Sequence, residues 1–324
     1  MRMIGINDYD ERTMVLAKPV YDTRGRILIG SGRALHAKLV ERLHEMGISC
    51  LMVEDEQSAG ITLDDMLDMP SWLEQIQLMQ LCYLTAKDKK VLLHREVFAC
   101  AGKLLNEVKT RKMVLPMPAA TIPTELQMYA HVVNVTIWAL LTGVRLGYNE
   151  LQLRDLAVGC LLHDIGKLLD EEPANHPEAG FNFIKTCREI SLIAAHIAFQ
   201  HHESLDGKGY PRGIDGGAFH PFAQVCGMAN LFEAKISSGS QAPHETMEYL
   251  MSLSGKRFTV EHVRAFVAAV PAYLPGMNVR MNNGREALVI GITGHLQRPV
   301  IRYQDTKEEQ NLAENPSVLV TQVI

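Results

Sequence analysis

The sequence predicts a mainly α-helical protein, with a small α+β module before the helical domain and a short β appendage after it. Residues 124–270 carry apolar side chains at helical spacing over nearly their whole length, whereas strand-like runs lie towards the two ends of the chain. The chain has 324 residues, of which 47% are hydrophobic and 21% charged. This length and composition suit a folded protein of two or three modules.

The N-terminal module is expected to span residues 1–55 and to mix strands with one helix. Strand-like runs cover Met14–Val20, Arg26–Ile29 and Cys50–Val53. The first two flank a turn signal at residues 22–25. Apolar residues at helical spacing predict a helix over Leu35–Met46, which Gly47 ends.

Three further segments complete the predicted organisation. Residues 56–115 are predicted to be a helical connecting segment, broken at Pro70 and without chemistry of its own. Residues 116–272 form the predicted helical domain, and residues 273–324 form the β appendage around a turn at residues 282–284, Asn-Asn-Gly. The strands expected in the appendage are Val279–Met281, Ala287–Ile292 and Val300–Tyr303.

Composition and charge exclude several classes of protein. The net charge is −5 and the pI is near 6.2, so no basic domain and no nucleic-acid surface are expected. No run reaches the length of about 18 apolar residues that predicts a membrane span, and the N-terminus lacks the apolar core of a signal peptide. The six cysteines form no C-x-x-C pair, which predicts reduced thiols in a cytoplasmic protein.

Histidines and carboxylates concentrate in one part of the helical domain. Six of the 13 histidines lie between positions 131 and 202. The centre of this region is the string His163-Asp164-Ile165-Gly166-Lys167, at the end of a predicted helix. Neutral imidazole suits transition metals, and a carboxylate adds charge and can bridge two ions. Lys167 lies one helical turn beyond His163, and Gly166 leaves room for a ligand to approach. An isolated His-Asp pair is more often an interior ion pair, but the longer string is far more specific.

A second cluster follows about forty residues later. Residues 201–203 read His-His-Glu, and residues 206–211 read Asp-Gly-Lys-Gly-Tyr-Pro. Two adjacent histidines at a helix end can serve two metals, and the glycines permit a tight loop. Taken alone, this loop is as typical of an ordinary turn as of a binding site.

Together these motifs resemble the HD-GYP family, a branch of the HD phosphohydrolase superfamily. The strings HDIGK, HHE and DGKGYP carry the resemblance, which covers roughly residues 131–234. Residues 15–28 also look like a regulatory module that precedes many such domains, and residues 257–258 and 274–280 look like the tail that follows them. The resemblance implies an HD-type helical bundle that hydrolyses cyclic di-GMP to pGpG or GMP in bacterial signalling.

The resemblance also implies roles for individual residues. It implies two divalent transition metals, Fe or Mn, with Asp164 as the bridging ligand, held by His131, His163, Asp164, His176, His201, His202 and Asn230. Asp164 and Lys167 are the implied catalytic residues, with Lys167 on the scissile phosphate. The implied substrate contacts are Lys167, Gly207, Gly209, Tyr210 and Pro211. Glu203 is a candidate for orienting the loop or accepting a proton, and His196 has no implied role.

The sequence departs from the family pattern in four places. Asn230 stands where a late aspartate is expected, which removes a negative charge from the ligand set. Gln127 stands where some members carry a glutamate for a third metal. Residues 236–242 lack an arginine that helps to hold substrate phosphate, although Lys235 is close by, and residues 167–176 are shorter than usual.

These departures keep three interpretations open. The chain is an active cyclic di-GMP phosphodiesterase, or a weakened domain that acts as a cyclic di-GMP receptor or protein scaffold, or an HD hydrolase of another nucleotide. The complete set of histidines with Asp164 favours catalysis, whereas Asn230 favours the receptor. The expected protein partner is a diguanylate cyclase domain, which would bind the GYP loop at residues 206–211. The expected assembly is a homodimer.

Overall fold

Helices dominate the computed structural model, which describes residues 1–62, 66–111, 113–214, 216–237 and 242–324. The α-helices in these ranges are α1 (Ala37–Glu45), α2 (Met69–Lys89), α3 (His94–Thr110), α4 (Thr124–Arg145), α5 (Glu150–Leu162), α6 (His176–Ile184), α7 (Leu192–Gln200), α8 (Pro221–Ser237), α9 (Pro243–Ser252) and α10 (Val260–Ala269). The strands are β1 (Arg2–Gly5), β2 (Val15–Leu16), β3 (Val20–Tyr21), β4 (Ile27–Ile29), β5 (Cys50–Glu54), β6 (Asn278–Met281), β7 (Glu286–Gly291), β8 (Val300–Tyr303), β9 (Glu309–Asn311) and β10 (Val320–Val323). The mainly α fold class predicted from the sequence is confirmed.

The N-terminal strands form two small sheets beside α1. One antiparallel sheet has the order β1-β5-β2, and β3 pairs with β4. Side chains from these strands, from α1 and from the residues just before and after α1 form a separate apolar core, which includes Leu16, Leu35, Leu43, Ile48 and Val53. The single strand predicted over Met14–Val20 is wrong, because the chain forms two short strands there that belong to different sheets.

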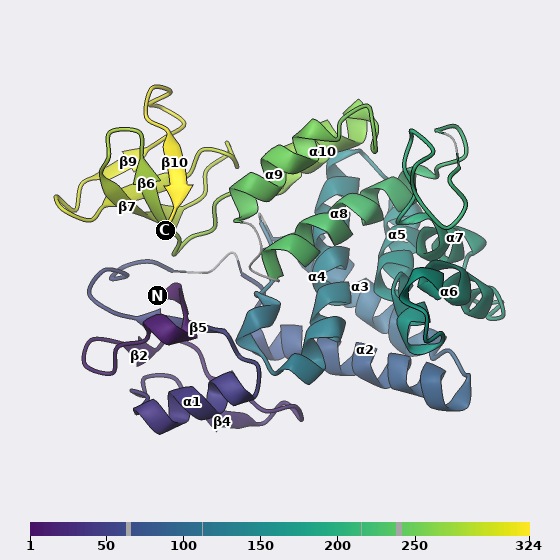
Figure 1. Ribbon diagram of the computed structural model, residues 1–324, viewed down its shortest axis with the longest axis horizontal. Helices are drawn as coiled ribbons and strands as arrows, with labels where there is room; N and C mark the ends of the chain where they lie inside the picture. The colour runs from purple at the N-terminus through teal and green to yellow at the C-terminus, as the bar shows by residue number, and fades with distance from the viewer. Residues whose placement is uncertain (63–65, 112, 215, 238–241) are drawn as a thin grey trace.

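The central element of the helical domain is α4. It packs against α2, α5, α8 and α10, while α5 packs against α3 and α7, and one continuous apolar core joins these helices (Figure 1). The helices α2 and α3, which come from the segment expected to connect two domains, contribute to this core. The Trp72 indole donates to Asn134 Oδ1 at 2.8 Å, and the Tyr83 hydroxyl donates to the Leu161 carbonyl at 2.9 Å. Pro70 lies in the first turn of α2, where its missing N–H costs no helical hydrogen bond.

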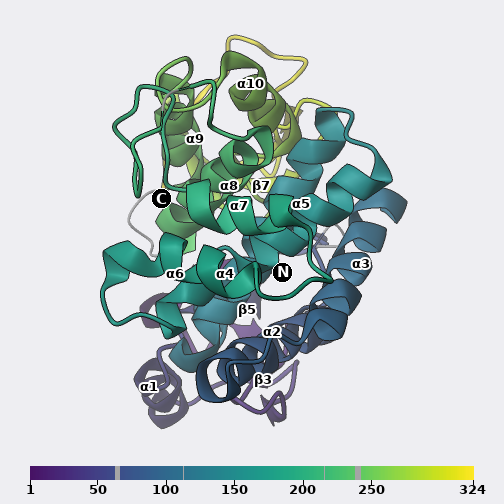
Figure 2. The same ribbon diagram turned by 90° about the vertical axis from the view of Figure 1, so that its right-hand side faces the viewer.

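The C-terminal strands form an antiparallel sheet of order β10-β6-β7-β8-β9. Gly284 has a φ of +81° in the turn between β6 and β7, where the sequence predicts a tight turn. This sheet and the N-terminal strands lie on the same side of the helical domain, opposite α6 and α7 (Figures 1 and 2). Arg302 links the C-terminal sheet to the segment that follows β5, since its guanidinium donates to the Ala59 carbonyl at 2.6 Å. Across the described ranges, the helices lack the combination of length and apolarity that crossing a membrane requires.

Candidate metal centre

Helix ends bring most of the predicted ligands to one place. His163 and His201 follow the last residues of α5 and α7, and His176 is the first residue of α6. His131 and Asn230 lie within α4 and α8, which pack side by side. These helices come together in the helical domain with α6 and α7 on its outer side (Figure 2). Residues that are far apart in the sequence therefore share one site.

The carboxylate of Asp164 is the centre of this site and is fully buried. Its Oδ2 atom lies 3.4 Å from His163 Nε2 and 3.7 Å from His131 Nε2. Its Oδ1 atom lies 3.4 Å from His176 Nε2 and 3.7 Å from His201 Nε2. Each carboxylate oxygen therefore faces its own pair of histidines.

Backbone carbonyls orient three of these rings in the same way. The Nδ1 atom lies 2.7 Å from the Cys160 carbonyl in His163, 2.6 Å from the Pro173 carbonyl in His176 and 2.8 Å from the Ala198 carbonyl in His201. A carbonyl only accepts hydrogen bonds, so each Nδ1 carries the proton and donates it. In the neutral rings, Nε2 therefore presents a lone pair to the site, as a metal-ligating histidine does.

The polar atoms at the centre fit metal ions better than they fit one another. His176 Nε2 lies 3.2 Å from His201 Nε2, although both atoms present lone pairs. His202 Nε2 is also 3.2 Å from His176 Nε2. His163 Nε2 and Asp164 Oδ1 are buried without a hydrogen-bond partner in the described ranges. Unpaired buried acceptors are costly, and a cation between them would satisfy several at once. Two groups in this region have ligand atoms within 4.8 Å of one another: His131, His163 and Asp164, and His176, His201 and His202.

The protonation states agree with this arrangement. Burial lowers the pKa of the His163, His176 and His201 rings, and it lowers the pKa of His202 to about 3. Burial alone would raise the pKa of Asp164, but electrostatic interactions with the His163 ring and with the Lys167 ammonium group hold it well below its usual range. Neutral imidazoles around an ionised carboxylate are the forms that bind divalent metals.

Protein stripped of metal with a chelator is expected to lose stability as the pH falls from about 7.5 to about 5.5. Unfolded histidines take up protons near pH 6.5, whereas the buried rings take them up only at lower pH. The unfolded state therefore binds more protons in this window, and the free energy of unfolding decreases by at least about 1 kcal/mol. Urea unfolding at the two pH values measures this change. An unfolding free energy that stays constant or rises on acidification would contradict the assignment of these rings as neutral.

Lys167 lies at the edge of the site. Its ammonium group is 2.5 Å from Asp164 Oδ2, on the side that faces His131 and His163. About 43% of the Lys167 side chain is exposed, so it reaches both the buried carboxylate and solvent. This position suits a residue that compensates Asp164 in the absence of a ligand and can contact an anionic ligand when one is bound.

Asn230 and Gln127 occupy different environments. Asn230 is buried, and its Oδ1 atom lies 2.9 Å from His131 Nε2, so the structure places it beside a predicted ligand. The amide group of Gln127 instead donates to the carbonyls of Gly47 and Ile122, at 3.1 Å each. Gln127 therefore ties α4 to the backbone near the N-terminal strands.

The loop at residues 206–211 closes over His202. The Tyr210 ring stacks on the His202 ring with centroids 4.5 Å apart and an angle of 13° between the planes. Glu203 is buried and holds the loop, because its carboxylate accepts from the backbone N–H groups of Arg212 at 2.8 Å and Ile214 at 3.2 Å. Gly209 lies directly against the Glu203 backbone, which leaves no space for a side chain. The contacts of Glu203 match the orienting role considered for it.

At three positions the structure differs from the sequence prediction or adds to it. Gly166 does not leave room for a ligand, because the His176 carbonyl occupies the place where its side chain would be. His196 stays outside the cluster and packs on Phe181, with ring centroids 5.0 Å apart. Of the segment that lacks the expected arginine, residues 238–241 lie outside the described ranges, and Lys235 lies over the Tyr249 ring.

Sequence reasoning missed a cluster of buried, hydrogen-bonded polar side chains, one helical turn from His131 and Asn230, which we call the buried clamp. It consists of Trp72, Asn134, Trp138 and Glu233. The available signal was the spacing, since Asn134 follows His131 by three residues and Glu233 follows Asn230 by three. Such residues lie on the same helix face as the ligands above them.

The chain is similar to a known domain family and to proteins named as cyclic dinucleotide phosphodiesterases. The family model described as "HD domain" matches residues 114–259. The chain is 27% identical over 185 residues to the cyclic di-GMP phosphodiesterase PA4108 of Pseudomonas aeruginosa, covering 50% of this chain and 44% of that protein. It is 30% identical over 124 residues to the 3'3'-cGAMP-specific phosphodiesterase 1 of Vibrio cholerae, covering 32% of this chain and 29% of that protein. The chain thus spans less than half the length of these relatives.

A solved structure shares the wider architecture. Bd1817, an HD-GYP-type protein from Bdellovibrio bacteriovorus, matches with a TM-score of 0.51 and 15% sequence identity. The match covers 82% of this chain and 97% of that chain, and at this identity it supports the fold alone. The family match and the shared fold agree: residues 114–259 match the HD domain family, within an architecture shared with a solved HD-GYP-type protein.

Proposed function

We propose that this chain is a metal-dependent phosphodiesterase that hydrolyses cyclic di-GMP to pGpG or GMP. The observation that carries the proposal is the Asp164 carboxylate, whose two oxygens face separate pairs of histidines. That arrangement suits a bridging ligand between two ions, the type of centre that promotes phosphodiester hydrolysis. The relatives named as cyclic dinucleotide phosphodiesterases support the class of substrate.

The proposed centre holds two divalent ions, Fe or Mn. The residues that would hold them are His131, His163, Asp164, His176, His201, His202 and Asn230. Nitrogen and carboxylate ligands without thiolates suit these metals. When bound, the ions would supply Lewis-acid charge and an activated water.

The protein groups around the centre have distinct tasks in the proposed hydrolysis, in which water adds across one P–O bond of the ring. Lys167 would shift its ammonium group from Asp164 to a phosphate oxygen, and its partly exposed side chain permits this movement. Tyr210, 40% exposed beside His202, offers an aromatic face on which a guanine base can stack. The loop backbone at Gly207, Gly209 and Pro211 would shape the rim that receives the substrate.

The test is chromatography of cyclic di-GMP after incubation with protein reconstituted anaerobically with Fe²⁺ or Mn²⁺. Formation of pGpG or GMP by the wild-type chain, and its absence with Asp164→Ala, would support the proposal. Nucleotide that remains intact with both metals would overturn it. Parallel reactions with 3'3'-cGAMP test the alternative of another cyclic dinucleotide as substrate, which the Vibrio cholerae relative favours.

A second candidate function is a cyclic di-GMP receptor without turnover. Asn230 favours this candidate, because it contacts His131 directly and brings no negative charge to the ligand set. Isothermal titration with cyclic di-GMP distinguishes the two functions. Binding without product indicates the receptor.

Asn230→Asp is expected to tighten metal binding about tenfold or more, because a carboxylate adds charge at His131 and ligand charge tunes metal affinity. Competition with a metal-sensitive dye measures the change. Asn106→Asp provides the matched control, since it makes the same change at an exposed position of α3 outside the proposed ligand set and should add no affinity. If both variants gain equally, or if Asn230→Asp gains nothing, Asn230 is not part of the ligand set.

The proposal extends to location and partners. All six cysteines are free thiols, which supports a reducing compartment such as the cytoplasm. We further propose a homodimer, and contact of the loop at residues 206–211 with a diguanylate cyclase domain. Light scattering of the purified chain tests the dimer, and Tyr210→Ala in a binding assay with such a domain tests the contact.

A further inference from the structure

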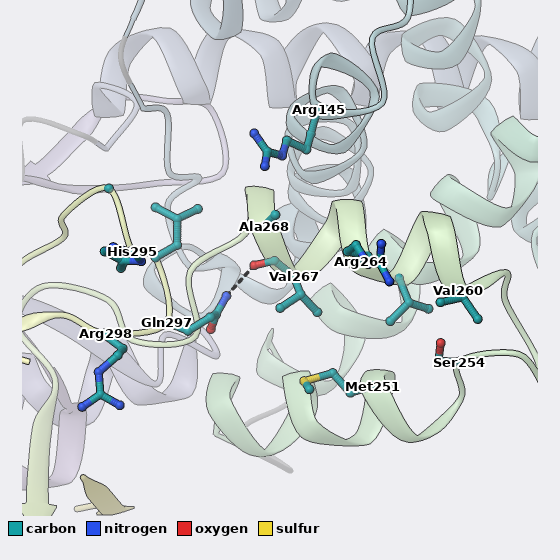
Figure 3. Close-up of a pocket in the computed structure, with 13 residues that line it drawn as sticks. Arg145, Met251, Ser254, Val260, Arg264, Val267, Ala268, His295, Gln297 and Arg298 are labelled. Carbon is teal, nitrogen blue, oxygen red and sulfur yellow. Dashed lines mark hydrogen bonds between the residues drawn. The ribbon is translucent and has the colours of Figure 1, made fainter. Parts of the chain in front are cut away.

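A groove of about 790 Å³ runs along α10, where the helical domain meets the C-terminal sheet (Figure 3). The end of α9 borders it on one side and the end of α4 on the other, and residues 294–298 between β7 and β8 close it at one end. Gln297 fixes this closing loop, because its amide donates to the carbonyls of Val267 and Val270 at 2.7 Å each. The groove therefore has a defined wall, and its lining includes none of the proposed metal ligands.

The charge of the groove is opposite to that of the chain. The described residues that line it include Arg145, Arg264, Arg298 and His295 but no aspartate or glutamate, although the whole chain has 37 acidic and 32 basic residues. Arg298 is already engaged, since its guanidinium donates to the Leu312 carbonyl at 2.7 Å and to two further carbonyls. Arg145 and Arg264 make no side-chain hydrogen bond or ion pair with any described residue. Two unpaired guanidinium groups on one groove favour an anionic occupant.

The floor of the groove is apolar. Val260 and Met251 are each 53% exposed there, beside Val263 and Val267. A second hollow of about 340 Å³ shares Arg145, Ala268, Gly294 and Leu296 with the groove. Its other lining residues are mostly apolar, among them Met113, Leu141, Val144 and Ile292. A cationic region thus continues into an apolar one.

We propose that this groove binds an organic anion with an aliphatic chain, such as a medium-chain carboxylate. The carboxylate head group binds at the arginines that line the groove, because the planar guanidinium groups of Arg145 on α4 and Arg264 on α10 suit a carboxylate. The aliphatic chain of the ligand lies along the valines of α10 and extends towards the adjoining hollow. The size of the groove is within the range of roughly 300–1,000 Å³ that small-molecule sites occupy.

The test is isothermal titration of the full-length chain with decanoate, below its micelle concentration. Wild-type protein should bind one decanoate saturably. The double variant Arg145→Gln/Arg264→Gln should bind at least about tenfold more weakly, because it loses two charge-assisted contacts. The control Arg42→Gln/Arg95→Gln removes two exposed arginines far from the groove and should bind like the wild type.

A second measurement keeps the proposal falsifiable if the double variant fails to fold. Decanol has the same chain without the charge and should bind wild-type protein at least about tenfold more weakly than decanoate. Absence of decanoate binding, equal binding by the double variant, or equal binding of decanol would each overturn the proposal. None of these results depends on phosphodiesterase activity, so the two proposals stand or fall separately.

Discussion

Asp164→Ala is expected to abolish metal loading and turnover together. The substitution removes the only carboxylate among the proposed ligands, to which four histidine Nε2 atoms lie within 3.7 Å. Loss of a group that merely orients a metal ligand already lowers affinity or activity by about 10–100-fold. Loss of the bridging ligand itself should exceed about a hundredfold. Metal content by mass spectrometry and product formation by chromatography measure the two effects.

Two further variants separate loss of chemistry from loss of structure. Asp164→Asn preserves the shape of the buried side chain but not its charge, and we expect it to fold and to lose metal as Asp164→Ala does. Asp170→Ala removes a nearby carboxylate that accepts a hydrogen bond from the Glu172 backbone N–H, and it should retain metal and activity. Retention of full metal content by both Asp164 variants would show that the ions lie elsewhere.

The motifs predicted which residues meet at the site, because metal-ligating side chains can be recognised by residue type and spacing. His131, His163, His176 and His201 do surround Asp164. The sequence could not show how the rings are oriented, since backbone carbonyls fix Nδ1 in three of them and a carbonyl has no residue identity. The prediction that Gly166 leaves room for a ligand was wrong. A glycine indicates close approach of another group, but only the fold shows that this group is the backbone of α6.

Strand prediction failed where polar residues interrupt the apolar alternation. In β1 the inward side chains are Arg2 and Ile4, and Arg2 is buried because it pairs with Asp55 at 2.7 Å. An inward arginine removes the alternation that marks a half-buried strand. The edge strand β9, Glu-Gln-Asn, has no apolar residue at all and depends on pairing with β8. Such strands owe their structure to tertiary contacts rather than to local pattern.

The buried clamp beneath the site depends on Glu233. This carboxylate is 1% exposed and accepts hydrogen bonds from Asn134 and Trp138 at 2.9 Å each and from Ser237 at 2.6 Å. These three donors are neutral side chains, two on α4 and one on α8. The same two helices carry His131 and Asn230 one turn away. The clamp therefore fixes the register in which these two side chains meet.

Glu233→Ala is expected to lower the free energy of unfolding by about 3 kcal/mol or more, because it leaves three donors without their acceptor at about 1–3 kcal/mol each. Urea unfolding of metal-free protein measures this loss, and Glu248→Ala, an exposed glutamate on α9, should change it by no more than about 0.5 kcal/mol. Glu233→Gln should recover part of the stability, since it keeps one acceptor oxygen but adds an amide donor that faces other donors. The folded fraction of Glu233→Ala should also bind metal more weakly at the His131 side, because the register between α4 and α8 is no longer fixed there. Full stability with full metal affinity in this variant would mean that apolar packing alone holds the two helices in place.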